Sequence, residues 1–232
     1  MSSYSQQIIW CAAFIGIAVY LSKQGKDKIK RVFDLLSAFL FVLLAIQLAM
    51  VWASGASLLR NALPFHLCSF TAILTIPMLL RRDDRLFQFN FCLGMPGALM
   101  ALIFPTVGYS PWPVPARMLF IAIHSIIFFS PILMYVCGHR TRRRSAFIVM
   151  AIGNVLMVGA LAANHLLNTN YMFLSNAPQG TPLEFMARNG KAIYLVWLEL
   201  CALVVTQVLS LAFAGHTRSD INLAEAVVRM KN

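Results

Sequence analysis

The sequence contains little charge for its length. Only 12% of its 232 residues are Asp, Glu, Lys or Arg, whereas 59% are hydrophobic. Soluble domains are about 25% charged, and they need that charge to keep their surface in water. An ordinary soluble globular protein is therefore excluded, and the composition is typical of a multi-pass membrane protein.

Polar interruptions are also few, and they leave seven apolar segments. Most of these approach the ~20 residues that a helix needs to cross a ~30 Å hydrocarbon layer, and the first and third are short. Their hydrophobicity is continuous rather than alternating, which predicts helices. The segments are 7–22, 34–54, 65–80, 86–106, 118–138, 146–167 and 192–214. We expect an all-α membrane protein, one domain over residues 1–232 formed by a bundle of seven transmembrane helices.

A cleavable signal is absent. No basic residue precedes the first apolar segment, and no A-x-A-like site follows it. A secretory signal peptide needs both features. The first segment is therefore expected to stay in the protein as a membrane helix.

Acidic residues are scarce, and the basic ones are unevenly placed. Fifteen of the 19 basic residues lie after the first, third and fifth segments and in the tail: Lys23, Lys26, Lys28, Lys30, Arg31, Arg81, Arg82, Arg85, Arg140, Arg142, Arg143, Arg144, Arg218, Arg229 and Lys231. The other four are Arg60, Arg117, Arg188 and Lys191. The positive-inside rule then predicts an external N-terminus and a cytoplasmic C-terminus. Basic residues spread in this way contact lipid headgroups, so we expect membrane phospholipids as partners and no nucleic acid, in spite of the net charge of +11.

Metal and redox motifs are absent as well. The sequence contains no HExxH, HxxxH or CxxC pattern. Its five cysteines all fall in apolar segments: Cys11, Cys68, Cys92, Cys137 and Cys201. An odd number of buried cysteines is not a disulfide framework. We predict no cofactor and no metal site.

What the apolar segments do contain is a set of polar residues at one depth. His66 begins the third segment, His124 lies about 10 Å into the fifth, and His165 ends the sixth, close to Asn170. Glu199 lies about 12 Å into the seventh. A charge at a helix centre costs about 2.5–3.5 kcal/mol, so Glu199 needs a proton or a partner. We expect these side chains to face one polar cavity in the outer half of the bilayer, with Asn164 as the alternative to His165.

The stretch "FCLGMPGALMALIFPTVGYSPWP" interrupts the fourth segment with glycine and proline. Gly94, Pro96 and Gly97 favour a kink and a close helix contact. Pro105 is expected to end the helix near the outer surface. Packing is sufficient to explain these residues.

The motifs "LPFHLCSFTAIL", "GMPGALMALIFP", "FIAIHSIIFFSPILMY", "NTNYMFLSNAP" and "YLVWLEL" occur in this order on the third to seventh segments. Together they resemble the YwaF family of bacterial integral membrane proteins, to which the eukaryotic transmembrane protein 164 is similar. The first two segments match in hydrophobicity alone. The resemblance implies a bacterial cytoplasmic membrane protein. It also implies phospholipid acyl transfer, which the eukaryotic relative performs with a cysteine beside a histidine in a Pro-Cys-His motif.

Residue by residue, the resemblance is incomplete. Pro64 and His66 match the proline and histidine of that motif, but Phe65 stands in the place of the cysteine. Cys68 is three residues further on and would face the same way on a helix, which makes it a candidate nucleophile. The run from Gly97 to Pro105 and the histidine His124 also match.

Three classes of function stay open. An enzyme acting on lipid acyl groups would use His66, His124, Cys68 and Glu199 as catalytic residues, with His165, Asn170, Gly97 and Pro105 in the binding site. A zinc variant of this enzyme would use the three histidines as ligands. A transporter or flippase could use the same cavity, although internal repeats are not detected. In a non-catalytic partner protein the polar residues would only join helices. We favour an acyltransferase or hydrolase, with transport as the alternative.

Overall fold

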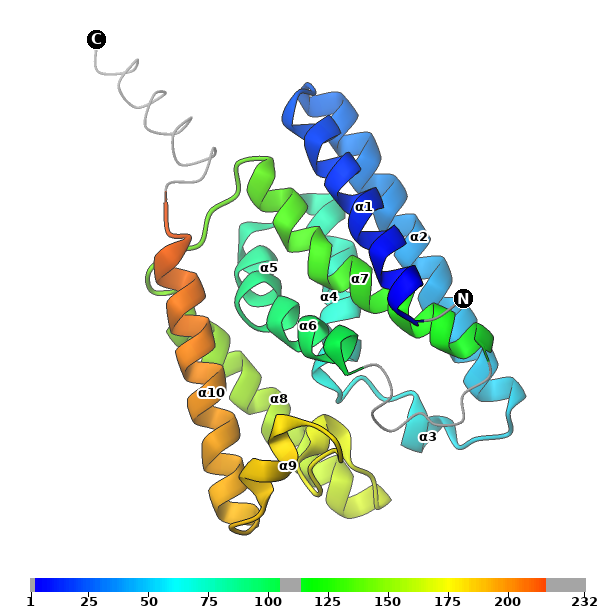
Figure 1. Ribbon diagram of the computed structural model, residues 1–232, viewed down its shortest axis with the longest axis vertical. Helices are drawn as coiled ribbons and strands as arrows, with labels where there is room; N and C mark the ends of the chain where they lie inside the picture. The colour runs from blue at the N-terminus through cyan, green and yellow to red at the C-terminus, as the bar shows by residue number, and fades with distance from the viewer. Residues whose placement is uncertain (1–2, 105–113, 216–232) are drawn as a thin grey trace.

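The computed structural model describes residues 3–104 and 114–215 (Figure 1). Within these residues the regular secondary structure is helical, apart from one isolated bridge between Thr141 and Ala214. The helices are α1 (Ser3–Ser22), α2 (Lys26–Ala53), α3 (Leu58–Asn61), α4 (Leu67–Arg81), α5 (Asp84–Phe89), η1 (Asn90–Gly94), α6 (Met95–Ile103), α7 (Val114–Val136), α8 (Ser145–Leu167), η2 (Tyr171–Phe173), α9 (Pro182–Ala187) and α10 (Lys191–Ala212). Each apolar segment of the sequence corresponds to a helix, the fourth to α5, η1 and α6 together.

Helix α2 begins two turns earlier than its apolar segment. Its first turns are polar, and Lys30 forms an i,i+4 ion pair with Asp34 at 2.8 Å. Asp34, the first residue of the second apolar segment, therefore lies about two turns inside the helix. The apolar pattern misses this extension because a helix that leaves the bilayer continues with polar residues.

The chain is a multi-pass membrane protein. Five helical stretches are long and apolar enough to cross a bilayer: Lys26–Ala53, Asp84–Ile103, Val114–Val136, Ser145–Leu167 and Lys191–Ala212. Two further apolar helices are shorter, Gln6–Ser22 and Leu67–Arg81, and they are the two segments predicted to be short. Seven crossings and the orientation of the termini stay predictions.

A turn of π-helix, η1, joins α5 to α6. Pro96 follows it and has no N–H to donate to the carbonyl of Cys92, four residues earlier, so a regular α-helical ladder cannot continue there. Gly94 ends the π-turn against α4, where an added Cβ would lie 2.8 Å from Cγ2 of Thr71. The irregularity expected from Gly94 and Pro96 thus takes the form of a π-bulge and a close contact.

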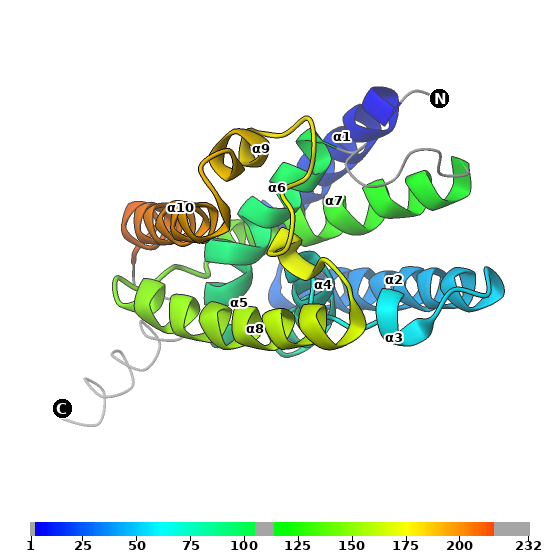
Figure 2. The same ribbon diagram turned by 90° about the horizontal axis from the view of Figure 1, so that it is seen from below.

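Helix α7 is the central helix. In the most apolar 18-residue stretch of α7, 61% of the residues are buried within the protein. The same share in α10 is 11%. Figure 2 shows α2 and α8 along one side of the molecule and α1, α7 and α10 along the other. In Figure 1 the α1–α2 and α7–α8 connections lie at one end, and the connection from α8 through α9 to α10 lies at the opposite end.

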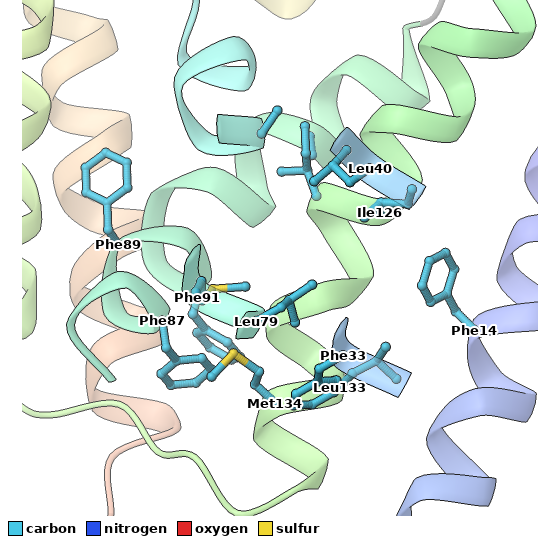
Figure 3. Close-up of a cluster of buried hydrophobic side chains, with 14 of the residues drawn as sticks. Phe14, Phe33, Leu40, Leu79, Phe87, Phe89, Phe91, Ile126, Leu133 and Met134 are labelled. Carbon is cyan, nitrogen blue, oxygen red and sulfur yellow. The ribbon is translucent and has the colours of Figure 1, made fainter. Parts of the chain in front are cut away.

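The main core surrounds α7 and includes buried apolar side chains from α1, α2, α4, α5, η1, α6, α7 and α8. Those drawn in Figure 3 include Phe14, Phe33, Leu40, Leu79, Phe87, Phe89, Phe91, Ile126, Leu133 and Met134. A second, smaller cluster joins α8 to the segment after it through Ala160, Ala163, Tyr171 and Leu174. Phe65 packs on this second cluster, close to the beginning of α4.

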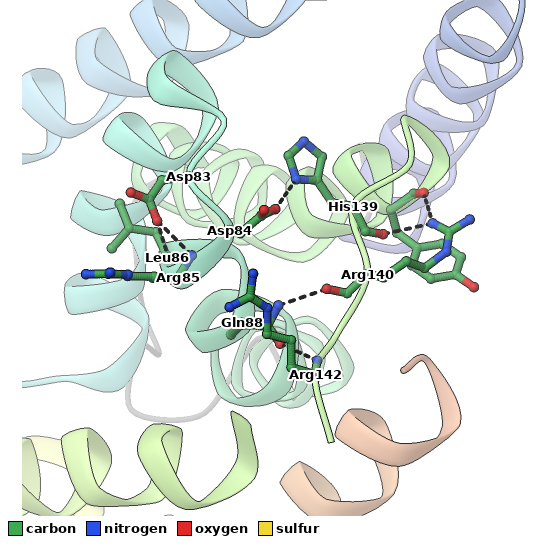
Figure 4. Close-up of polar contacts among 9 residues, drawn as sticks. Asp83, Asp84, Arg85, Leu86, Gln88, His139, Arg140 and Arg142 are labelled. Carbon is green, nitrogen blue, oxygen red and sulfur yellow. Dashed lines mark hydrogen bonds and ion pairs between the residues drawn. The ribbon is translucent and has the colours of Figure 1, made fainter. Parts of the chain in front are cut away.

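The connection between α7 and α8 is fixed to α5 by polar contacts (Figure 4). The amide of Gln88 donates to the carbonyl of Arg140 and accepts from the backbone N–H of Arg142, both at 2.9 Å. One turn away, His139 Nδ1 lies 2.6 Å from a carboxylate oxygen of Asp84. These contacts pair the start of α5 with the end of α7 and so fix which residues of the two antiparallel helices lie at the same depth.

Candidate active site

His66 is the N-cap residue of α4 and has extended backbone angles. Pro64, two residues earlier, disfavours a helical conformation in the residue before it, and the helix begins at Leu67. The imidazole of His66 packs edge-on against Tyr171, with ring centroids 5.1 Å apart, and against Phe173. Its Nδ1 accepts a hydrogen bond from the backbone N–H of Met172 at 3.3 Å.

Met172, whose N–H contacts His66, belongs to the segment of residues 168–176 that follows α8. We name this segment the strap. Asn164 holds the strap from the last turn of α8. Its amide nitrogen donates to the carbonyl of Tyr171 at 3.0 Å, and its oxygen accepts from the N–H of Tyr171 at 2.6 Å and from the hydroxyl of Thr169 at 3.0 Å. The side chain of Asn164 is buried, so these bonds are protected from water.

The strap has an unusual backbone. Met172 and Phe173 have φ angles of 53° and 57°, in the left-handed region that non-glycine residues rarely adopt. Such residues cost about 1–3 kcal/mol each and persist where the surroundings enforce them. Here the hydroxyl of Tyr194 donates to the carbonyl of Phe173 at 3.0 Å, while His66 accepts from Met172. Strain of this kind is concentrated at functional sites.

His124 lies in the middle of α7 and is 6% exposed. Its Nδ1 lies 2.8 Å from the carbonyl oxygen of Phe120, one turn earlier. A carbonyl can only accept, so Nδ1 carries the proton and a neutral ring leaves Nε2 as an acceptor. That Nε2 is buried and has no hydrogen-bond partner among the described residues. A buried basic nitrogen without a partner is rare in proteins and requires an explanation.

The two imidazoles have complementary hydrogen-bonding states. Because a backbone N–H can only donate, Nδ1 of His66 is an acceptor and its neutral ring carries the proton on Nε2. His66 therefore presents a donor and His124 presents an acceptor. Backbone groups fix both tautomers.

Glu199 and His165 are both less buried than His124. Glu199 is half-buried on α10 and forms no ion pair with another described residue. The groups that contact the ring nitrogens of His124 and His66 are the backbone of Phe120 and of Met172. His165 is exposed, and its neighbour Asn164 is the buried residue, as in the alternative considered from the sequence.

Cys68 does not share a helical face with Phe65, the residue in the place of the motif's cysteine. Phe65 lies in the turn before α4, so the spacing of three residues to Cys68 is not a helical spacing. Phe65 packs on the second cluster, where Gly159 approaches its ring, while Cys68 packs on the main core. The argument that placed Cys68 on the face of Phe65 therefore does not hold.

The other predicted binding residues have packing roles or lie elsewhere. An added Cβ at Gly97 would lie 3.1 Å from Cδ2 of Leu67, so Gly97 lets α6 approach the first turn of α4. The amide of Asn170 donates to the carbonyl of Asn176 and accepts from two backbone N–H groups, which shapes the strap. Pro105 lies outside the described residues. Within the described ranges no group of three or more His, Cys, Asp and Glu residues could hold a metal ion.

A family model, described as the TMEM164 family, matches residues 1–210. The chain belongs to the TMEM164 family. This confirms the resemblance to relatives of transmembrane protein 164, and the match also includes α1 and α2, which the motifs had not covered. No curated protein and no solved structure matches this TMEM164-family chain.

The sequence prediction of the site was incomplete in one respect. It included His66 and His124 but omitted Tyr171 and Met172, the strap residues that contact His66. The signal was present in "NTNYMFL", where asparagines follow the end of an apolar helix and favour left-handed and turn conformations. The contact with His66 spans more than a hundred residues, so no local pattern predicts it.

Proposed function

We propose that this protein transfers or hydrolyses an acyl ester of a membrane lipid, with His124 as the general base and His66 as the donor to the ester carbonyl. The observation that carries the proposal is the Nε2 atom of His124, which is buried and without a partner while Nδ1 is fixed on the carbonyl of Phe120. A general base needs a free acceptor in a fixed tautomer. The family membership and the implied acyl transfer of the resembling eukaryotic protein agree with it.

The proposed step uses both histidines. A hydroxyl oxygen attacks the carbonyl carbon of the ester, and its proton passes to Nε2 of His124. The carbonyl oxygen gains the negative charge and accepts a hydrogen bond from Nε2–H of His66. When the intermediate collapses, the carbon–oxygen bond to the glycerol breaks, and the departing oxygen takes the proton from His124. Water as the attacking group gives a fatty acid, and an alcohol gives a new ester.

We propose water or a lipid hydroxyl, rather than Cys68, as the nucleophile. Two observations support this choice. The position of the cysteine in the resembling motif is Phe65, which has no nucleophilic atom, and Cys68 packs among apolar side chains of the main core. A thiol surrounded by apolar groups resists ionisation, and only the thiolate is a strong nucleophile.

The proposed setting is the bacterial cytoplasmic membrane, crossed seven times with the N-terminus outside. In that orientation the strap and both histidines lie in the outer half of the bilayer, and the ester belongs to a phospholipid of the outer leaflet. The fifteen basic residues on the other side support this orientation.

The test compares His124→Gln with His165→Gln in purified full-length protein, with lipid products followed by mass spectrometry. Glutamine keeps the size and polarity of the side chain but cannot take up a proton at neutral pH. We expect His124→Gln to lose about 10²- to 10⁴-fold in turnover and His165→Gln to stay close to the unmodified protein. Unchanged turnover in folded His124→Gln would reject His124 as the base.

A further inference from the structure

Arg117 lies seven residues before His124 in α7. At 3.6 residues per turn, seven residues are almost two complete turns, so the two side chains leave the helix on the same face. At 1.5 Å per residue Arg117 is about 10 Å nearer the end of the molecule that carries the strap. The face of α7 that presents the free Nε2 of His124 thus continues outward to a guanidinium group.

Arg117 differs from the other basic residues of the strap end in its burial. Arg60, Arg188 and Lys191 are all exposed, whereas Arg117 is half-buried. Among the described residues it forms no ion pair. A bound anion stabilises a partly buried guanidinium, because it supplies charged acceptors for the N–H groups. Arg117 has no carboxylate paired with it among the described residues, so it can bind a ligand that brings its own negative charge.

The depth of Arg117 matches a headgroup. A bilayer is about 40–45 Å thick with its headgroup layers and about 30 Å without them, so each layer measures roughly 5–7 Å. Arg117 directly precedes the apolar segment that begins at residue 118, so it is expected where the hydrocarbon meets the headgroup layer. A lipid phosphate in that layer would meet Arg117, and the acyl-ester side of the same lipid would extend inward toward His124.

We propose that Arg117 binds the phosphate of the lipid whose ester reacts between His66 and His124. The inference rests on the proposed function and adds a residue that selects phosphorylated lipids. A guanidinium offers a planar fork of donors that fits two phosphate oxygens. It therefore distinguishes a phospholipid from diacylglycerol, which has the same ester bonds and no phosphate.

The experiment measures turnover of phosphatidylglycerol and of diacylglycerol in nanodiscs by the unmodified protein, Arg117→Gln and the control Arg60→Gln. We expect Arg117→Gln to lower kcat/KM for phosphatidylglycerol by about 10- to 100-fold, as for the loss of a charge-assisted bond. Its kcat/KM for diacylglycerol should stay within about threefold, and Arg60→Gln should leave both substrates unchanged. An equal loss on both lipids, or no loss on phosphatidylglycerol, would overturn the role of Arg117.

A binding measurement separates this inference from the proposed function. If the unmodified protein turns over neither lipid, the proposed function fails, and native mass spectrometry of the same variants with the same lipids decides the role of Arg117. We expect Arg117→Gln to bind phosphatidylglycerol about 10-fold more weakly than Arg60→Gln and to bind diacylglycerol equally. Equal binding of phosphatidylglycerol by both variants would reject the site. Displacement of phosphatidylglycerol by equimolar inorganic phosphate would assign the site to a soluble anion and overturn the lipid.

Discussion

Asn164 and Tyr171 are joined by two hydrogen bonds, one in each direction. The amide nitrogen of Asn164 donates to the carbonyl of Tyr171, and the amide oxygen accepts from its N–H at 2.6 Å. Both bonds are buried, and the next backbone N–H along the chain, that of Met172, contacts His66. A side chain at the end of α8 thereby determines the position of a ring at the start of α4.

The first prediction concerns this link. Asn164→Leu keeps the branched shape of the side chain but leaves the N–H of Tyr171 without a partner, at a cost of about 1–3 kcal/mol. It also removes one of two hydrogen bonds to the carbonyl of Tyr171, which still accepts from the N–H of Leu174 at 3.2 Å. We expect a clearly lower thermal unfolding temperature in detergent and faster proteolysis within the strap. The exposed neighbour provides the control, because His165→Leu removes none of these bonds. Equal unfolding temperatures for the two variants would contradict the structural role of Asn164.

The second prediction concerns orientation. An alkaline phosphatase fused after Thr106 is expected to be active, and one fused after Arg143 inactive, because the positive-inside rule places the connection at Arg143 in the cytoplasm. Phosphatase activity in cells carrying each fusion is the measurement. The opposite pattern would reverse the orientation and move the two histidines to the inner leaflet.

The third prediction concerns Cys68. Because this side chain packs on the main core, Cys68→Ala and Cys68→Ser should both keep turnover within a few-fold of the unmodified protein. His66→Ala should lose roughly 10²-fold or more, because the donor to the carbonyl oxygen is removed. Lipid turnover by folded protein is the measurement. A severe loss in both cysteine variants would instead indicate a covalent acyl-cysteine intermediate.

The fourth prediction concerns the contact between η1 and α4. Gly94→Ala places a methyl group 2.8 Å from Cγ2 of Thr71, so the π-turn or α4 has to shift, at a cost of about 1–3 kcal/mol. Gly16→Ala in α1 is the matched control, since no heavy atom lies within 4 Å of its added Cβ. We expect a lower unfolding temperature for Gly94→Ala alone. Similar values for both variants would show that the contact tolerates a methyl group.

The fifth prediction concerns the connection between α7 and α8. Gln88→Leu removes two hydrogen bonds that hold the backbone of Arg140 and Arg142, while the hydrogen bond between Asp84 and His139 stays in place. We expect a lower unfolding temperature and faster amide hydrogen exchange in this connection. The exposed Gln47 of α2 supplies the control, Gln47→Leu. Unchanged exchange in Gln88→Leu would mean that the contact between Asp84 and His139 is sufficient to hold the connection.

The sequence by itself determined the class of the protein and the position of its membrane helices. Continuous apolar segments in a chain with 12% charged residues leave few alternatives to a helical membrane protein, because unpaired backbone groups are costly in lipid. The same hydrophobicity gave less accurate helix ends, as α2 shows with Asp34 inside it. It also indicated an irregularity near Pro96, because a missing N–H interrupts the ladder in any surroundings.

Only the tertiary structure decided which polar residues meet. Depth in the bilayer placed His66, His124, His165 and Glu199 at one level, but depth does not fix the direction in which a side chain leaves its helix. That direction depends on packing, which turned Asn164 inward and His165 outward. The hydrogen-bonding states of His66 and His124 likewise depend on the backbone groups of Met172 and Phe120. The contact with Met172 forms between residues distant in sequence, because folding brings the strap back over the start of α4.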